Sequence, residues 1–137
     1  MQDYRRLRVW KKAHALTLNV RRATSKFPPT GYASLKGQIT RSVESVAFNI
    51  VEGCGARSQK DLARFLDISI KSTFEVEYQL QLARDYEVLD DRGWRSLAHE
   101  SIDVRRMLCG LRAKVLASEP SRSISHGKTD NGKTVDS

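Results

Sequence analysis

The chain has 137 residues, enough for one domain with a buried core, and its 39% hydrophobic and 29% charged residues are typical of a soluble helical protein. No run approaches the ~20 apolar residues of a membrane span, and the sequence lacks the apolar stretch of a secretory signal. The two cysteines are too few for a disulfide framework. We therefore expect the protein to reside in a reducing cytoplasm. Residues 1–41 hold ten Lys or Arg against one acid, whereas the rest is nearly neutral, and this excess favours a polyanionic partner such as nucleic acid.

The first two predicted helices cover about residues 4–27 and 32–53. Apolar residues of the first recur at helical spacing: Trp10, Ala13, Thr17, Val20, Thr24 and Phe27. This helix stops at a strong breaker, Phe27-Pro28-Pro29-Thr30-Gly31. One side of the second helix is apolar, at Leu35, Ile39, Val43, Val46 and Ile50.

The third and fourth predicted helices cover about residues 58–88 and 92–118. Ser58 stands where an N-cap is expected, with Asp61 three residues later. The inner stripe of the third helix is Leu62, Phe65, Ser69, Ser72, Val76, Gln79 or Leu80, Ala83 and Tyr86. We expect a turn at Asp90-Asp91-Arg92-Gly93 before the fourth helix. Its apolar spacing alternates between four and three, which is typical of near-parallel bundle packing, at Leu97, Ser101, Val104, Leu108, Leu111 and Val115.

These elements predict an all-α protein. No stretch alternates with the period of a strand. Four helices joined by short loops favour an up-down-up-down four-helix bundle over residues 1–119. Residues 120–137 are polar apart from two isolated aliphatic side chains, and we expect them to form a disordered tail.

The first helix is predicted to carry a basic face. At 100° per residue, five polar side chains form a band opposite the apolar stripe, and Lys11 lies beside it: Arg8, Lys12, Asn19, Arg22 and Lys26. No acid lies between Asp3 and Glu44. The candidate phosphate contacts are Arg8, Lys11, Lys12, Arg22, Lys26 and, from the second helix, Arg41. The alternative is an ordinary solvated helix face.

Large apolar residues are also predicted on the outer side of the bundle. Ile70, Phe74 and Tyr78 project from the third helix opposite its inner stripe, and Phe48 does so from the second. A lone four-helix bundle covers one face of each helix, so these four residues predict self-association. The alternative is that they are scattered exposed aromatics of no special role.

Catalytic and metal-binding motifs are not found in the sequence, and we expect neither a metal nor a cofactor. Arg92 and His99 have the loose spacing of helical-bundle ribonucleases, in which a His acts as acid or base and an Arg steadies phosphate charge. Asn49 and Glu52, late in the second helix, are predicted to be structural. They are expected to bond across helices or to cap the turn into the third helix, with Arg57 or Arg41 as pairing partners.

Several motifs occur in order over about residues 7–117, and through them the chain resembles a known family. They are Leu7-x-Val9-Trp10, Phe27-Pro28, Leu35-x-Gly37-Gln38-Ile39-x-Arg41-Ser42, Ser45-Val46-x-x-Asn49-Ile50-x-Glu52-Gly53, Phe65-Leu66-x-Ile68-Ser69-x-x-Ser72, Glu75 and Leu80-x-Leu82-Ala83. Together they are similar to the bacterial four-helix-bundle family of 23S rRNA intervening-sequence proteins, which includes the accessory variability proteins of diversity-generating retroelements. Ala47 and Phe48 depart from the usual small pair before the Asn.

This resemblance implies a bundle assembled as a ring, a homopentamer in members of known structure. It implies no catalytic residues. Retroelement members bind nucleic acid and a reverse transcriptase, so the resemblance implies RNA or DNA, and a reverse transcriptase, as partners. We therefore expect a non-enzymatic, oligomeric, nucleic-acid-binding scaffold. The alternatives are a protein-interaction module encoded in an rRNA intervening sequence and a ribonuclease built on Arg92 and His99.

Overall fold

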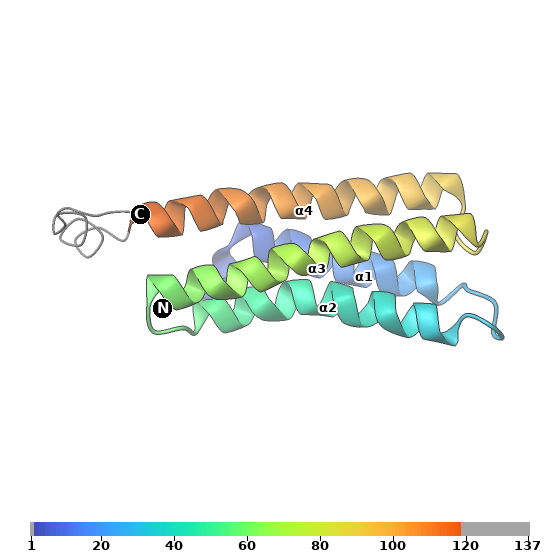
Figure 1. Cartoon of the computed structure of the whole chain (residues 1–137), viewed down its shortest axis with the longest axis horizontal. Coiled ribbons are helices and arrows are strands. Elements are labelled where there is room, and N and C mark those ends of the chain that lie inside the picture. Colours follow the sequence, from blue (N-terminus) through green and yellow to red (C-terminus); the bar gives the residue numbers. More distant parts are fainter. Residues whose placement is uncertain (1, 119–137) are drawn as a thin grey trace, which may run out of the picture.

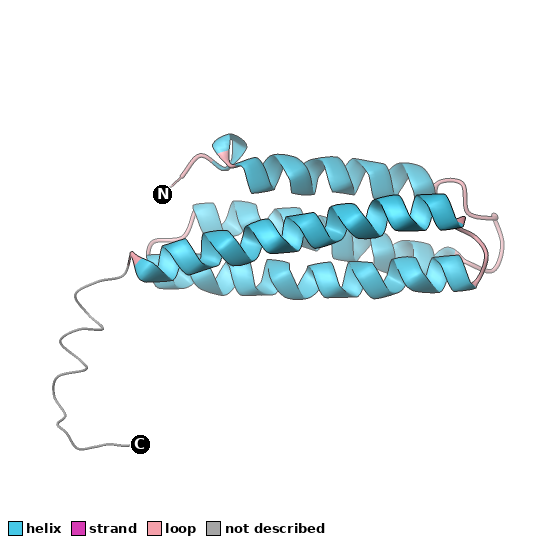
Figure 2. Cartoon of the chain, turned by 90° about the horizontal axis from the view of Figure 1, so that it is seen from above, coloured by secondary structure: helices cyan, strands magenta, loops and turns pink. Residues whose placement is uncertain are grey.

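The computed structural model describes residues 2–118, and helices are the only regular structure in that part of the chain (Figures 1 and 2). A 3-10 turn, η1 (Tyr4–Arg6), precedes four α-helices. These are α1 (Arg8–Thr24), α2 (Ala33–Cys54), α3 (Gln59–Asp85) and α4 (Asp91–Ala117). The tail expected at residues 120–137 lies outside the described residues.

The four helices form a bundle with a square cross-section. Helix α1 packs against α2 and α4, and α3 packs against the same two helices, while the backbones of the diagonal pairs do not approach each other closely. Short loops at alternate ends join helices that run in opposite directions (Figure 1). The predicted all-α four-helix bundle is therefore confirmed for the described residues.

Local capping residues determine where α3 and α4 begin. The Ser58 hydroxyl accepts the backbone N–H of Asp61 at 3.1 Å, as predicted. At α4 the Asp90 carboxylate accepts the N–H of Gly93 at 2.7 Å. The prediction of a separate turn at Asp90–Gly93 before the fourth helix is therefore wrong, because Asp90 is the N-cap of α4 and the next three residues form its first turn. Between α1 and α2, Gly31 adopts φ +94°, which favours glycine.

The first predicted helix is shorter than expected and is interrupted near its start. Leu7 is extended, with φ −81° and ψ 127°, and separates η1 from α1. The Asp3 carboxylate caps the start of η1 by accepting the backbone N–H of Arg5 at 3.1 Å. The Tyr4 ring then meets Trp10 edge-on, with ring centroids 5.0 Å apart. Helical periodicity does not reveal this break.

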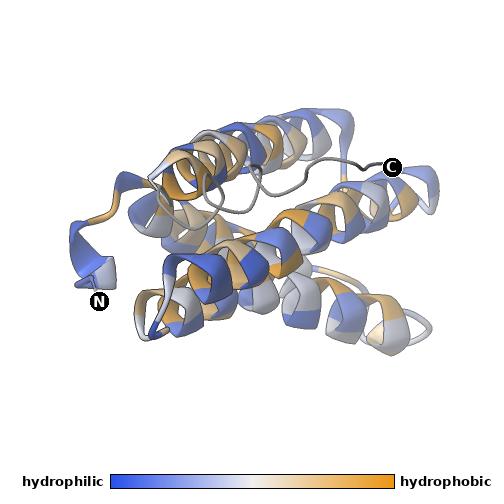
Figure 3. Ribbon diagram, turned by 60° about the vertical axis from the view of Figure 1, so that its left-hand side comes forward, coloured by the Kyte–Doolittle hydropathy of each residue, from blue (hydrophilic) through white to orange (hydrophobic). Residues whose placement is uncertain are grey.

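The core contains apolar residues from all four helices, which alternate with polar residues along each ribbon (Figure 3). The predicted stripe of α2 is buried throughout, and that of α4 is buried except for half-buried Leu111. The stripe predicted for the first helix is confirmed at four positions and wrong at Trp10 and Thr17, which are only half-buried. Their neighbours Val9 and Leu16 are buried instead. The confirmed positions are Ala13, Val20, Thr24 and Phe27. On α3, Leu66 is buried, and the predicted Phe65 and Tyr86 are half-buried and exposed. A bundle helix faces two neighbours, so its buried arc is wide and bulky rings lie at the edges.

Small hydroxyl residues line the contact between α2 and α3. The fully buried Ser69 hydroxyl donates to the carbonyl of Val46 at 2.7 Å, and Ser45 and Ser72 share a hydrogen bond of 2.9 Å. Asn49 joins this seam indirectly, because its amide donates to the Ser45 carbonyl at 2.8 Å and to the Ser45 hydroxyl at 3.0 Å. These bonds satisfy polar groups that would otherwise be buried at a cost.

Glu52 does not take the role expected of it. Its side chain is exposed and makes no hydrogen bond or ion pair with another described residue, so the predicted pairing with Arg57 or Arg41 is wrong. Asn49 lies one turn earlier and faces α3 through Ser45. The two residues therefore do not act together.

Candidate nucleic-acid interface

All six predicted phosphate contacts are exposed. Five come from α1 and the turn after it, and one from α2: Arg8, Lys11, Lys12, Arg22, Lys26 and Arg41. None forms an ion pair with a described carboxylate. Every ion pair in residues 2–118 is either Arg5–Asp3 or lies on α3 and α4. The positive charge of α1 therefore remains uncompensated by direct contact within the described fold.

The basic band of α1 was predicted to lie opposite the core. In the structure, part of it lies beside α4. The Asn19 amide donates to both carboxylate oxygens of Glu100 on α4, at 3.1 and 3.2 Å. The Asn19 carbonyl accepts a hydrogen bond from the Arg22 guanidinium at 2.6 Å. The Glu100 carboxylate is therefore hydrogen-bonded to the uncharged Asn19 amide, and the Arg22 guanidinium is hydrogen-bonded to the same amide.

Sequence reasoning missed one basic residue of this surface, Lys114. Arg8 and Lys114 line the same groove between α1 and α4, of about 310 Å³. The two residues are far apart in sequence, and Lys114 belongs to the nearly neutral remainder of the chain. Antiparallel packing of α1 on α4 brings the end of α4 beside the start of α1, which the bundle topology predicts only after the register is known.

Arg41 stands apart from the other five cations. It lies on α2, and its guanidinium folds back over Gly37, where an added Cβ would lie 3.2 Å from Nη1 of Arg41. The α1–α4 groove does not include it. Arg41 is therefore a separate cation on the outer side of α2.

The predicted apolar contact residues fall into two separate places. Phe74 and Tyr78 are 56% and 59% exposed on α3, and the Arg105 guanidinium of α4 lies 4.0 Å from the Phe74 ring centroid. Phe48 is 64% exposed but borders the groove between α1 and α2. Ile70 was expected outside, and this was wrong, because it is half-buried and packs against the core. Helix α3 widens its buried arc toward α4, and Ile70 lies within that arc.

The remaining chemistry of the described residues is sparse. No group of three or more His, Cys, Asp or Glu in residues 2–118 is arranged to hold a metal ion. None of the helices described is long and apolar enough to cross a membrane.

His99 lies on the exposed side of α4 with its Nε2 3.4 Å from an Asp103 oxygen. At the N-terminus, the hydrogen bond from the Arg5 side chain lowers the pKa of the Asp3 carboxyl.

Comparison with known proteins identifies the family. A model of the family described as 23S rRNA-intervening sequence protein matches residues 5–110, and the chain belongs to that family. No curated protein matches. The chain is similar to a solved structure of a protein with unknown function from the S23 ribosomal protein family of Bacteroides thetaiotaomicron, with 24% identity and a TM-score of 0.72. That match covers 76% of this chain and 97% of the other, and it shows a shared fold. Membership of the retroelement branch stays a prediction.

Proposed function

We propose that the chain is a non-enzymatic, self-associating bundle that binds RNA or DNA through the exposed basic side of α1. The observation that carries this proposal is the charge of that helix. Residues 8–24 include five Lys or Arg and no acid, and none of the five pairs with a described carboxylate. A reverse transcriptase partner stays a prediction from the family resemblance.

Polyanion binding by such a helix has a simple physical basis. The 17 residues of α1 span about 25 Å at 1.5 Å per residue. That length matches about seven phosphates of one strand at 3.4 Å spacing. Each cation that neutralises a phosphate releases a condensed counterion, so the affinity depends on salt and only weakly on sequence. The groove shared by Arg8 and Lys114 extends the surface onto α4.

Self-association is proposed through α3. Phe74 and Tyr78 are one turn apart, and both are more than half exposed, which is unusual for large rings on a monomer surface. Symmetric copies would repeat the basic side of α1, and linked weak phosphate contacts strengthen each other through effective concentration. The subunit number of five rests on the family resemblance.

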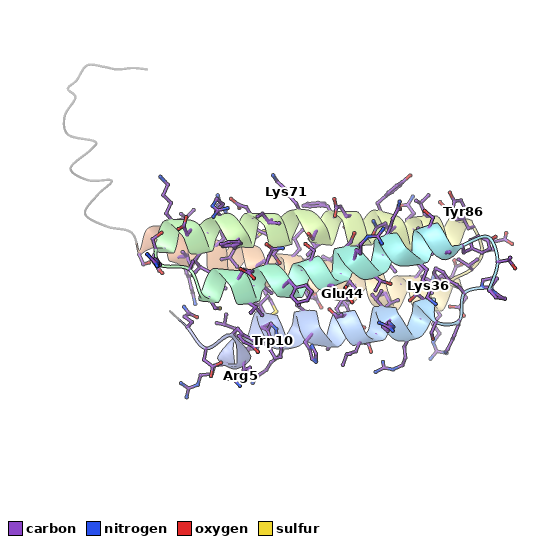
Figure 4. All side chains as sticks on the ribbon, turned by 90° about the horizontal axis from the view of Figure 1, so that it is seen from below. Arg5, Trp10, Lys36, Glu44, Lys71 and Tyr86 are labelled. Atoms are coloured by element: carbon purple, nitrogen blue, oxygen red, sulfur yellow. The ribbon has the colours of Figure 1, made fainter. Side chains whose placement is uncertain are left out.

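A salt titration tests the nucleic-acid proposal. The double variant Lys11→Gln/Lys12→Gln should lower the slope of log affinity against log salt by about 2, because each lost phosphate contact removes about 1. The matched control is Lys60→Gln/Lys71→Gln, which removes two exposed cations from α3 (Lys71 is marked in Figure 4). Absence of binding at ~50 mM salt, where phosphate contacts are strong, or equal losses in both variants, would refute the proposal.

Light scattering tests self-association. Phe74→Asp should shift the protein toward the 15.5 kDa monomer, because a carboxylate in an apolar contact is costly unless it is paired. Phe74 is more than half exposed in the described fold, so the substitution should spare the fold of the subunit. Tyr86→Asp is the control, since Tyr86 is also exposed but lies at the end of α3. An intact oligomer with Phe74→Asp, or a wild-type monomer at micromolar concentration, would contradict the interface.

The alternatives predict different results in the same assays. A pure protein-interaction module, favoured by the same exposed rings, would self-associate or bind a protein and show no salt-dependent retention of nucleic acid. A ribonuclease would cleave RNA, and His99→Ala would abolish cleavage. Wild-type protein that retains labelled RNA intact through a long incubation would exclude the ribonuclease.

A further inference from the structure

The groove between α1 and α2 contains a pocket of about 400 Å³ that is lined by four ring-bearing side chains, Tyr4, Trp10, His14 and Phe48. Trp10 and His14 stack with centroids 5.0 Å apart and planes 13° apart. Tyr4 meets Trp10 edge-on, and Phe48 faces them from α2. Figure 4 shows Trp10 in this groove, with Glu44 on α2 and Arg5 on η1. The volume is within the range of small-ligand pockets.

The polar groups of the pocket indicate which chemistry it accepts. Glu44 lines it and is half-buried, and its carboxylate makes no hydrogen bond or ion pair with another described residue. The Thr17 hydroxyl is already used, because it donates to the carbonyl of Ala13 at 2.8 Å. The pocket therefore offers an acceptor with negative charge beside flat apolar rings.

Positive charge lies at the edge of the pocket and not inside it. The Arg5 guanidinium lies 5.5 Å from the centroid of the Tyr4 ring, and it also forms an exposed ion pair with Asp3 at 3.1 Å. Lys11 is exposed one turn before His14 on α1. A phosphate is attracted to these cations and repelled by Glu44. A ligand that fits both regions carries its phosphate outside and a flat, hydrogen-bond-donating ring inside.

We propose that this pocket binds one unpaired nucleobase that carries an exocyclic amino group, within a single strand whose phosphates contact Arg5 and Lys11. The proposal rests on the nucleic-acid function proposed above. A base stacks on the aromatic rings, and its amino group donates to Glu44. Thymine and uracil have a carbonyl oxygen in place of that amino group. Their one donor on this edge, N3–H, lies between two carbonyl oxygens that the carboxylate repels, so they should bind less tightly. A base inside a duplex has both faces stacked and cannot enter.

Fluorescence anisotropy with labelled oligo(dC), oligo(dT) and a duplex of mixed sequence tests this. The pocket variant is Phe48→Ala, because Phe48 is exposed and its removal should spare the core. It should weaken oligo(dC) binding between about fivefold and a hundredfold, the range for losing one base–aromatic stack, and leave duplex binding unchanged. The control is Tyr86→Ala, another exposed ring far from this pocket, which should change neither.

Glu44→Gln tests the base preference separately. Wild-type protein should bind oligo(dC) more tightly than oligo(dT). Glu44→Gln should reduce that ratio, because the bond to the amino group is no longer charge-assisted. As a second readout, Trp94→Phe leaves Trp10 as the only tryptophan. Cytidine monophosphate should then quench the remaining fluorescence more strongly than uridine monophosphate.

The outcomes separate this proposal from the one on which it rests. If wild-type protein binds no nucleic acid, both the nucleic-acid proposal and the pocket proposal are refuted. If salt-dependent binding persists but Phe48→Ala and Tyr86→Ala behave alike, only the pocket proposal is overturned. If Phe48→Ala dissociates the oligomer and leaves oligo(dC) affinity unchanged, the pocket belongs to a contact between copies of the chain.

Discussion

Replacing Gly53 with alanine tests how closely α2 approaches α3. Gly53 lies in the last turn of α2, and a Cβ there would be 2.8 Å from Cδ1 of Leu62 and 3.2 Å from Cβ of Phe65. The Leu62 methyl lies at the end of a flexible side chain and can move, but the Cβ of Phe65 is fixed to the α3 backbone. We therefore expect Gly53→Ala to push the two helices apart.

The size of the effect follows from two opposing contributions. Alanine gains at most about 1 kcal/mol over glycine in a helix, whereas overpacking costs about 1–3 kcal/mol. Gly53→Ala should therefore lower the free energy of unfolding by up to about 2 kcal/mol. Gly110→Ala is the matched control, because a Cβ at Gly110, within α4, meets no atom within 4 Å. It should raise the free energy of unfolding by up to about 1 kcal/mol.

Urea unfolding followed by circular dichroism measures both variants, at one protein concentration because an oligomer gains stability by mass action. The two midpoints should move in opposite directions. If Gly53→Ala raises the free energy of unfolding as Gly110→Ala should, then α2 and α3 are not packed as closely as the structure indicates. A destabilised Gly110→Ala would show that this side of α4 is covered in solution.

Two further predictions concern charge and thiol chemistry. Glu100→Gln retains an acceptor for Asn19 but removes a negative charge from the α1–α4 side, so nucleic-acid affinity at low salt should rise; unchanged affinity would place the nucleic acid elsewhere. Cys109 is exposed and should react with a thiol reagent in the folded protein, whereas Cys54, whose pKa is raised chiefly by burial, should react only on unfolding. Equal reaction rates at the two cysteines would contradict the buried position of Cys54. Because the raised pKa keeps the Cys54 thiol protonated in the folded protein after it ionises in the unfolded chain, the free energy of unfolding should fall as the pH rises past the ordinary thiol pKa.

The sequence predicted the bundle because periodicity, breakers and caps agreed. The α2 stripe is continuous and apolar, so its orientation was correct, and Ser58 caps α3 as its residue type suggested. Four of the six predicted stripe residues of the first helix are buried. The two errors, Trp10 and Thr17, each have an apolar neighbour (Val9 or Leu16), and periodicity does not say which of the two points at the bundle axis. The break at Leu7 had no local signal, since neither proline nor glycine lies there.

The candidate site was predicted less completely than the fold. Exposure of the α1 cations followed from helical spacing, but their freedom from ion pairs depends on which acids other helices bring near. The aromatic pocket was missed because Trp10 had been assigned to the core and Glu44 had no assigned role. Only the packing of α1 on α2 brings them together. Residues that meet across a groove share no spacing in the sequence.

The absence of acids at the start of α1 is informative because it runs against local helix stability. An acid in the first turn stabilises a helix by about 0.3–1 kcal/mol through the helix dipole. Helices α3 and α4 have this feature at Asp61 and Asp91, together with side-chain caps. Helices α1 and α2 have neither, so their stability depends on packing. Unpaired cations such as Lys71 and Lys114 also lie on α3 and α4. Helix α1, however, contains no acid anywhere along its length, as expected of a surface that leaves its positive charge free for an external anion.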